Sequence, residues 1–87
     1  MKNFEAKVIV KMKPTIKDIK GLTIEHAVKS ILDVQDLSCR VGNAYYFNFS
    51  ANNQVEALHI VEKIAGEILS NDVIETYEIR SLEEVDE

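Results

Sequence analysis

The chain has 87 residues and a net charge of -5, with 46% hydrophobic and 29% charged residues. This length fits one small domain, which buries only about 60–65% of the surface that its unfolded chain exposes, and the composition is typical of a folded globular protein. Because the net charge is acidic and no long apolar segment or export signal is present, we expect a cytoplasmic protein that binds neither nucleic acid nor a membrane.

Charge is unevenly distributed along the sequence. Residues 1–20 contain six lysines and two carboxylates, whereas residues 72–87 contain seven carboxylates and one arginine. Clustered cations attract acidic partners and phosphate groups. The amino-terminal segment therefore predicts one basic edge on an otherwise acidic protein.

The first predicted elements are a strand and a helix. Apolar and polar residues alternate over Phe4–Lys13, which is typical of a half-buried strand. Pro14 ends this strand because it has no backbone N–H to donate. Asp18 stands at the N-cap of an apolar helical repeat, which predicts a helix over Ile19–Leu32.

A hairpin and a second helix are predicted next. Val34–Val41 and Ala44–Ser50 read as two strands, and the Gly42-Asn43 pair between them is a strong signal for a tight turn. Asn53 and the glutamate three residues later resemble a capping box, which predicts a helix over Gln54–Leu69.

The last strand completes a recognisable order. Residues Val73–Arg80 are rich in β-branched and aromatic side chains. The resulting order βαββαβ predicts an α+β, ferredoxin-like fold, with a four-stranded antiparallel sheet and two helices on one face. We expect residues 1–81 to form a single domain and residues 82–87 to be an acidic, frayed tail.

The sheet face without helices is predicted to be partly apolar. Ile9 interrupts the polar side of the first strand, and Ala44 and Tyr46 share one side of the strand over Ala44–Ser50. Exposed apolar surface on a small domain commonly marks an association site. The sequence therefore predicts a homodimer or a homotetramer.

The stretch KMKPTIKDIKG, at residues 11–21, is the first candidate binding site. A phosphate loop of the Walker type needs glycines and a lysine in fixed positions, whereas Thr15 stands here and no lysine follows Gly21. A helix N-terminus flanked by Lys17 and Lys20 still attracts anions. Anion binding and a simple strand-end and helix-cap function both stay open.

Catalytic chemistry has no recognisable residues in this sequence. Cys39 has no identifiable histidine partner, and neither His26 nor His59 has a second histidine three or four residues away. The aromatic stretch RVGNAYYFNF is similar to an RNA-recognition strand only in part, because its glycine lies in the predicted turn. We therefore predict no catalytic, cofactor or metal site, and an assembly or binding function.

Three segments together are similar to one known family. These are VKMKPTIKDIKG, VQDLSCRVGNAYYFNF and LSNDVIETYEI. They resemble the PurS family, the small subunits of phosphoribosylformylglycinamidine synthase, in which a K-P-G-V-x-D-P-x-G stretch, an R-V-G-K turn and an L-A-N-P-V-I-E-x-Y-E ending recur at similar positions. The resemblance spans about residues 6–80, on the predicted βαββαβ order.

This resemblance implies a function in purine synthesis. The enzyme of that family converts formylglycinamide ribonucleotide, glutamine and ATP to the amidine, glutamate, ADP and phosphate. The resemblance implies that the chain is not an enzyme on its own and binds no cofactor, although the complex uses ATP and Mg. Its implied partners are a glutaminase subunit and a large synthetase subunit, which it bridges while it assists ammonia transfer.

The resemblance also indicates residues for the contacts with these partners. The implied interface residues are Lys13, Pro14, Asp18, Gly21, Arg40, Val41 and Gly42, and the basic edge adds Lys17. The chain departs from the family pattern at four other positions, namely Thr15, Ile19, Asn43 and Asp72. These departures keep the fold plausible and bear on the geometry of the subunit contacts.

The alternative is a ferredoxin-like regulatory module that binds a small molecule as a dimer. Such a module would bring a glycine-rich turn between its first strand and first helix close to the ligand. Pro14 and Thr15 occupy that turn here and count against it.

Overall fold

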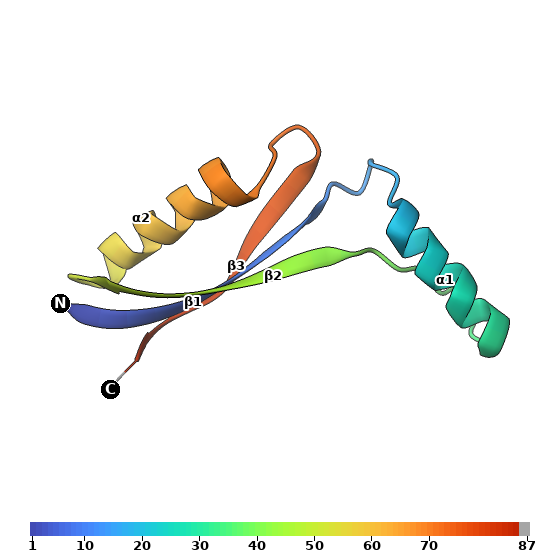
Figure 1. The fold of residues 1–87 in the computed structure, drawn as a ribbon, viewed down its shortest axis with the longest axis horizontal. Coiled ribbons are helices and arrows are strands. Elements are labelled where there is room, and N and C mark those ends of the chain that lie inside the picture. Colours follow the sequence, from blue (N-terminus) through green and yellow to red (C-terminus); the bar gives the residue numbers. More distant parts are fainter. Residues whose placement is uncertain (86–87) are drawn as a thin grey trace.

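The computed structural model describes residues 1–85. Three strands form one antiparallel sheet in the order β2-β1-β3, so that β1 is the central strand (Figure 1). The elements in chain order are β1 (Lys2–Met12), α1 (Ile19–Ile31), β2 (Gly42–Ala51), α2 (Gln54–Ile64), the π-helical turn η1 (Ala65–Leu69) and β3 (Glu75–Val85).

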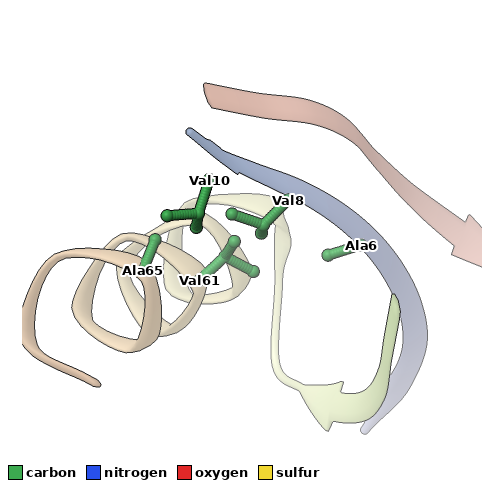
Figure 2. Packing of buried hydrophobic residues seen from close by; sticks show 5 residues of the cluster. All are labelled: Ala6, Val8, Val10, Val61 and Ala65. Atoms are coloured by element: carbon green, nitrogen blue, oxygen red, sulfur yellow. The ribbon is translucent and has the colours of Figure 1, made fainter. Parts of the chain in front are cut away.

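The core lies between β1 and the continuous helix made by α2 and η1. Ala6, Val8 and Val10 point from one side of β1 and are at most 1% exposed. Val61 and Ala65 pack against them from the helix, as Figure 2 shows. Alternation along a strand places every second residue on one face, which is why these β1 positions share the core. The predicted first strand is confirmed, with slightly different ends.

A second, smaller cluster extends the core toward the amino terminus. Phe4, Ala51 and Ala57 are buried together. The ring of Phe4 stacks on that of Phe49, with 6.0 Å between their centroids. Small alanines at the end of β2 and on α2 allow the helix to approach the sheet closely.

Both predicted helix caps are confirmed. Asp18 precedes α1 and accepts a hydrogen bond from the N–H of Gly21. Asn53 precedes α2, and its Oδ1 accepts from the N–H of Glu56 at 2.9 Å. Side-chain acceptors at these positions satisfy amide groups that have no partner within the helix. The predicted second helix reaches Leu69 as expected, but its last part is π-helical.

The expected four-stranded sheet is wrong, because the predicted strand at Val34–Val41 does not form. Two of its backbone amides donate to side chains instead. The N–H of Cys39 donates to Glu25 Oε1 at 3.1 Å, and the N–H of Val41 donates to Asp18 at 2.7 Å. Such acceptors compete with a sheet ladder for the same donors. The segment therefore follows α1 and does not pair with β2.

The prediction of two helices on one face is also wrong. Figure 1 shows α2 lying along the sheet, whereas α1 extends beyond the end of the sheet. In α1, all of which the structure describes, only Gly21 is buried. We refer to α1 and the segment that follows it, residues 19–41, as the arm.

The predicted turn at Gly42-Asn43 is part of β2. Gly42 pairs with Lys11, and Asn43 pairs with Val10. A Cβ atom on Gly42 would lie 3.0 Å from the carbonyl oxygen of Val10, so the glycine permits a close approach between β1 and β2. Among non-glycine residues that the structure describes, positive φ occurs at Asp36, with φ of 54°. That residue lies between α1 and β2, where the chain reverses.

The expected frayed tail at residues 82–87 is contradicted for residues 82–85. They belong to β3, where Asn3 pairs with Val85 and Phe4 pairs with Glu84. Leu82 packs against the core clusters, and this apolar contact is the physical reason for the longer strand. Residues 86 and 87 lie outside the described residues.

The face of the sheet opposite α2 carries mixed chemistry. The ammonium group of Lys7 lies 5.5 Å from the centre of the Tyr46 ring, a cation–π distance. Ile9 on the same face is half-buried. The aromatic residues Tyr45 and Phe47 lie on the other face, against the core.

A prediction follows for the glycine at the base of the arm. Gly21→Ala should lower the free energy of unfolding by about 1–3 kcal/mol, because its methyl group would collide with the carbonyl oxygen of Cys39. Gly66→Ala is the control, since a methyl group there would meet the ring of Tyr77 at 3.7 Å, an ordinary contact. Urea denaturation measures both, and equal stability of the two variants would contradict the described packing.

Candidate functional site

The residues implied as an interface converge where the arm leaves the sheet. We refer to this region, residues 13–21 together with residues 39–42, as the joint. Asp18 lies at its centre and is 5% exposed. Its Oδ1 accepts a hydrogen bond from the N–H of Gly21 at 2.8 Å, and its Oδ2 accepts one from the N–H of Val41 at 2.7 Å. One carboxylate therefore caps α1 and also holds the start of β2.

These two hydrogen bonds change the acidity of Asp18. The backbone N–H of Val41 contributes most, followed by that of Gly21, and together they hold the pKa of the Asp18 carboxyl below its ordinary value of 3.8. Hydrogen bonds to the ionised form favour that form. Asp18 is therefore charged at neutral pH and stabilises the joint in that form.

Arg40 ties the proline turn to the arm. Its Nη2 donates to the backbone carbonyl oxygens of Lys13 and Ile16, both at 2.8 Å. These oxygens lie on either side of Pro14, so a single guanidinium fixes the turn. The N–H of Lys13 in turn donates to the carbonyl oxygen of Ile74 at 2.8 Å, which connects the joint to the start of β3.

Close packing accompanies these hydrogen bonds. Gly21 leaves no space for a side chain, because a Cβ atom there would collide with the carbonyl oxygen of Cys39. Glu25 accepts from the N–H of Cys39, and it also pairs with Lys29 at 3.7 Å within α1. The joint is therefore held by backbone contacts and buried polar groups.

The structure brings all eight sequence-predicted interface residues into the joint, but most of them have a structural explanation. Asp18, Gly21, Arg40, Val41 and Gly42 contact other parts of the same chain. Their recurrence in a family motif is explained by folding alone. Whether they also contact a partner stays a prediction.

The lysines of the joint are different. Among residues 1–85, no carboxylate lies within ion-pair distance of Lys13, Lys17 or Lys20. Lys17 and Lys20 are exposed, and Lys13 is half-buried. Their charge is therefore available to an acidic partner.

Cys39, His26 and His59, the residues considered for chemistry, lie on three different segments of the chain. Among the described residues, no three His, Cys, Asp or Glu side chains are grouped so that they could hold a metal ion. Cys39 is half-buried, and His26 and His59 are exposed on different helices. In residues 1–85, no helix is both long enough and apolar enough to span a bilayer.

A small cavity lies beside the joint. Its volume is about 180 Å³, and Asp18, Lys20 and Glu75 contribute to its lining. Ligand sites usually occupy about 300–1,000 Å³, and both oxygens of Asp18 are already bound within the chain. The cavity therefore gives no support to the regulatory-module alternative.

Sequence reasoning missed the contribution of Glu25. This residue lies on α1 and binds the backbone of Cys39, which is 14 positions away. Its position four residues before Lys29 also allows an ion pair within the helix, which the structure shows at 3.7 Å. The spacing of Glu25 from Asp18, two turns along one side of a helix, is the signal that could have indicated a shared task.

Comparison with known proteins identifies the family. The PurS profile, described as phosphoribosylformylglycinamidine (FGAM) synthase, matches residues 5–83. The chain belongs to the PurS family. The PurS subunit of phosphoribosylformylglycinamidine synthase from Thermotoga maritima is 30% identical over 79 residues, which are 91% of this chain and 96% of that protein.

Solved PurS structures share the fold. Thermus thermophilus PurS is 29% identical, with a TM-score of 0.83 over 97% of this chain and 99% of that chain. A chain in the structure of PurLQS from Thermotoga maritima is 31% identical, with a TM-score of 0.79 over 98% of this chain and 100% of that chain. These matches span nearly the whole chain, and they therefore include the arm.

Lowering the pH should reduce the stability that the Asp18 carboxylate contributes to the joint. Because the folded pKa is lowered, the unfolded chain takes up the proton first as the pH falls. The contribution of Asp18 is therefore complete above pH 3.8 and is lost as the pH falls through the lowered folded pKa.

Urea denaturation from about pH 6 to about pH 2 should show this loss, and Asp18→Asn should be less stable at pH 6 with a shallower pH dependence. The other carboxylates titrate in both proteins, so the difference between them isolates Asp18. Parallel pH profiles for the two proteins would contradict the assignment.

Proposed function

We propose that this chain is a non-catalytic small subunit of phosphoribosylformylglycinamidine synthase, which bridges the glutaminase and ATP-dependent synthetase subunits and assists ammonia transfer. The observation that carries the proposal is membership of the PurS family over residues 5–83. The similarity to a chain of the PurLQS structure supports assembly with other subunits.

The bridging function has a physical basis. Holding two subunits together raises the effective concentration of each near the other and fixes their orientation. Ammonia made by the glutaminase then reaches the synthetase without equilibrating with solvent, where it would take up a proton. ATP and Mg belong to the synthetase step, and this subunit binds neither. Such a complex works in the cytoplasm.

The joint is the surface that we assign to a larger subunit. It presents Lys13 and Lys17 without an ion-pair partner among residues 1–85, beside Pro14 and the base of the arm. Asp18 and Arg40 hold this surface in one shape from within. A rigid basic surface suits an acidic partner, because little side-chain and loop entropy is lost on binding.

Self-association is the second part of the proposal. The chain has a thin core of its own and leaves several large apolar side chains exposed, including Ile31 and Ile24. Such surface on a small domain favours pairing with another chain. We assign a homodimer as the basic unit, from which a tetramer can form.

Omission of the chain tests the bridge. The glutaminase and synthetase subunits without this protein should fail to form the amidine from glutamine, whereas the synthetase supplied with ammonium salt should keep its activity. Steady-state assays with each nitrogen source measure both. Undiminished glutamine-dependent activity without this chain would refute the bridging function.

Charge reversal tests the basic surface. Lys13→Glu combined with Lys17→Glu should weaken binding to the larger subunits by tenfold or more at low salt, because both ammonium groups lose their attraction for an acidic partner. The control is Lys63→Glu on α2, outside the joint, and this variant should bind normally. Analytical ultracentrifugation measures assembly, and circular dichroism checks the fold. Unchanged assembly of the double variant would count against this surface.

A further inference from the structure

The helix made by α2 and η1 changes its hydrogen-bond pattern near its end, and this change moves one apolar side chain to the surface. The N–H of Ser70 donates to the carbonyl oxygen of Ala65 at 3.0 Å, five positions earlier, as in a π-helix. In an α-helix, Ile68 would lie on the same side as the buried Val61 and Ala65. The wider turn brings Leu69 onto the core instead, and Ile68 is 76% exposed.

This arrangement is unfavourable for the chain alone. An isoleucine side chain gains stability from burial, and here Ile68 gives up a place beside the core. The hydroxyl group of Ser70 is buried at the end of η1 and has no hydrogen-bond partner among residues 1–85. Proteins keep features that cost local stability where function needs them, and π-helical turns are frequent at functional sites. The end of η1 is therefore a candidate contact surface.

The connection from η1 to β3, drawn in orange in Figure 1, adds further exposed apolar side chains. Val73 lies in this connection and is 77% exposed, and Tyr77 on β3 is 39% exposed. The Tyr77 ring lies close to η1, because a Cβ atom on Gly66 would be 3.7 Å from it. We refer to Ile68, Val73 and Tyr77 together as the turn surface.

Hydrogen bonds explain the shape of the connection but not its exposed side chains. Oδ1 of Asn71 accepts from the N–H of Val73 at 3.0 Å, and Oε1 of Glu75 accepts from the N–H of Asn71 at 2.9 Å. These bonds give Asn71 and Glu75, within the motif LSNDVIETYEI, a function in folding. The side chain of Val73 belongs to the same motif and stays exposed, so burial within this chain does not account for it.

The charge around the turn surface is acidic. Residues 64–79 contain four carboxylates and neither lysine nor arginine. Two of these carboxylates, Glu67 and Asp72, are exposed and have no ion-pair partner among residues 1–85. An apolar surface with an acidic border is complementary to an apolar side chain that has lysines or arginines around it.

The turn surface adjoins the basic joint. The N–H of Lys13 donates to the carbonyl oxygen of Ile74, the residue directly after Val73, at 2.8 Å. A partner that covers both regions therefore meets lysines on one side and carboxylates on the other. Such a pair of opposite charges selects one docking orientation, because the reversed orientation would place like charges together.

We propose that the turn surface is the apolar anchor and the acidic half of the subunit interface whose basic half is the joint. The partner presents an apolar side chain bordered by lysine or arginine to the turn surface, and carboxylates to Lys13 and Lys17. This inference rests on the proposed function and specifies the chemistry of the subunit that binds the joint.

Two double variants of the full chain test the anchor and its border separately. Ile68→Ser with Val73→Ser should raise the Kd for the subunit that binds the joint by about tenfold or more at any salt concentration, because apolar contacts are not screened. Glu67→Lys with Asp72→Lys should raise the Kd by about fivefold at roughly 0.05 M salt and by less than about twofold at roughly 0.5 M salt. Surface plasmon resonance with the glutaminase and synthetase subunits immobilised separately measures both.

Each kind of change has a matched control elsewhere on the chain. Val55→Ser removes an apolar side chain that is 65% exposed at the start of α2, and Glu83→Lys reverses an exposed carboxylate on β3. Both controls should bind normally, and circular dichroism checks the fold of every variant. Val73→Ser alone, in the connection before β3, keeps the test decisive if the double variant does not fold.

Comparison with Lys13→Glu combined with Lys17→Glu separates the possible outcomes. That variant and the two turn-surface variants should lose affinity for the same subunit and keep their affinity for the other. Unchanged affinity of Ile68→Ser with Val73→Ser, or a loss toward the other subunit, would overturn this inference and leave the proposed function intact. Altered self-association of that variant in sedimentation would also overturn it. Failure of the unmodified chain to bind either subunit would overturn both.

Discussion

One carboxylate organises the connection between the sheet and α1. The two oxygens of Asp18 bind amides from different segments, the first turn of α1 and the residue before β2. Because each oxygen has a separate task, the beginning of α1 and the beginning of β2 are fixed relative to each other. The direction of the arm depends on this arrangement.

Local sequence signals predicted most of the elements, but they did not predict hydrogen bonds between residues that are far apart in the chain. Asp18 and Asn53 were identified as helix caps because a cap acts within three residues of itself. The strand predicted over Val34–Val41 does not form, although its alternation of apolar and polar residues suits a strand. Its amides bind Glu25 and Asp18, 14 and 23 positions earlier in the chain, and no local pattern encodes that competition.

The candidate site was predicted as a set of residues but not as a mechanism. The resemblance to PurS indicated the proline turn and the Arg40–Gly42 segment, and the structure brings them together. It also shows that Arg40 acts on backbone carbonyl oxygens and that Gly42 permits close strand packing. A motif can therefore recur because it shapes a surface, while the partner contacts that we propose involve less distinctive neighbours such as Lys17.

The position of β1 has a consequence for synthesis of the chain. β1 is made first, yet it is the central strand, and its two neighbours are residues 42–51 and 75–85. The sheet around Phe4 and Val8 is therefore complete only after residues 75–85 have left the ribosome. Until then, an unpaired apolar strand is open to other nascent chains.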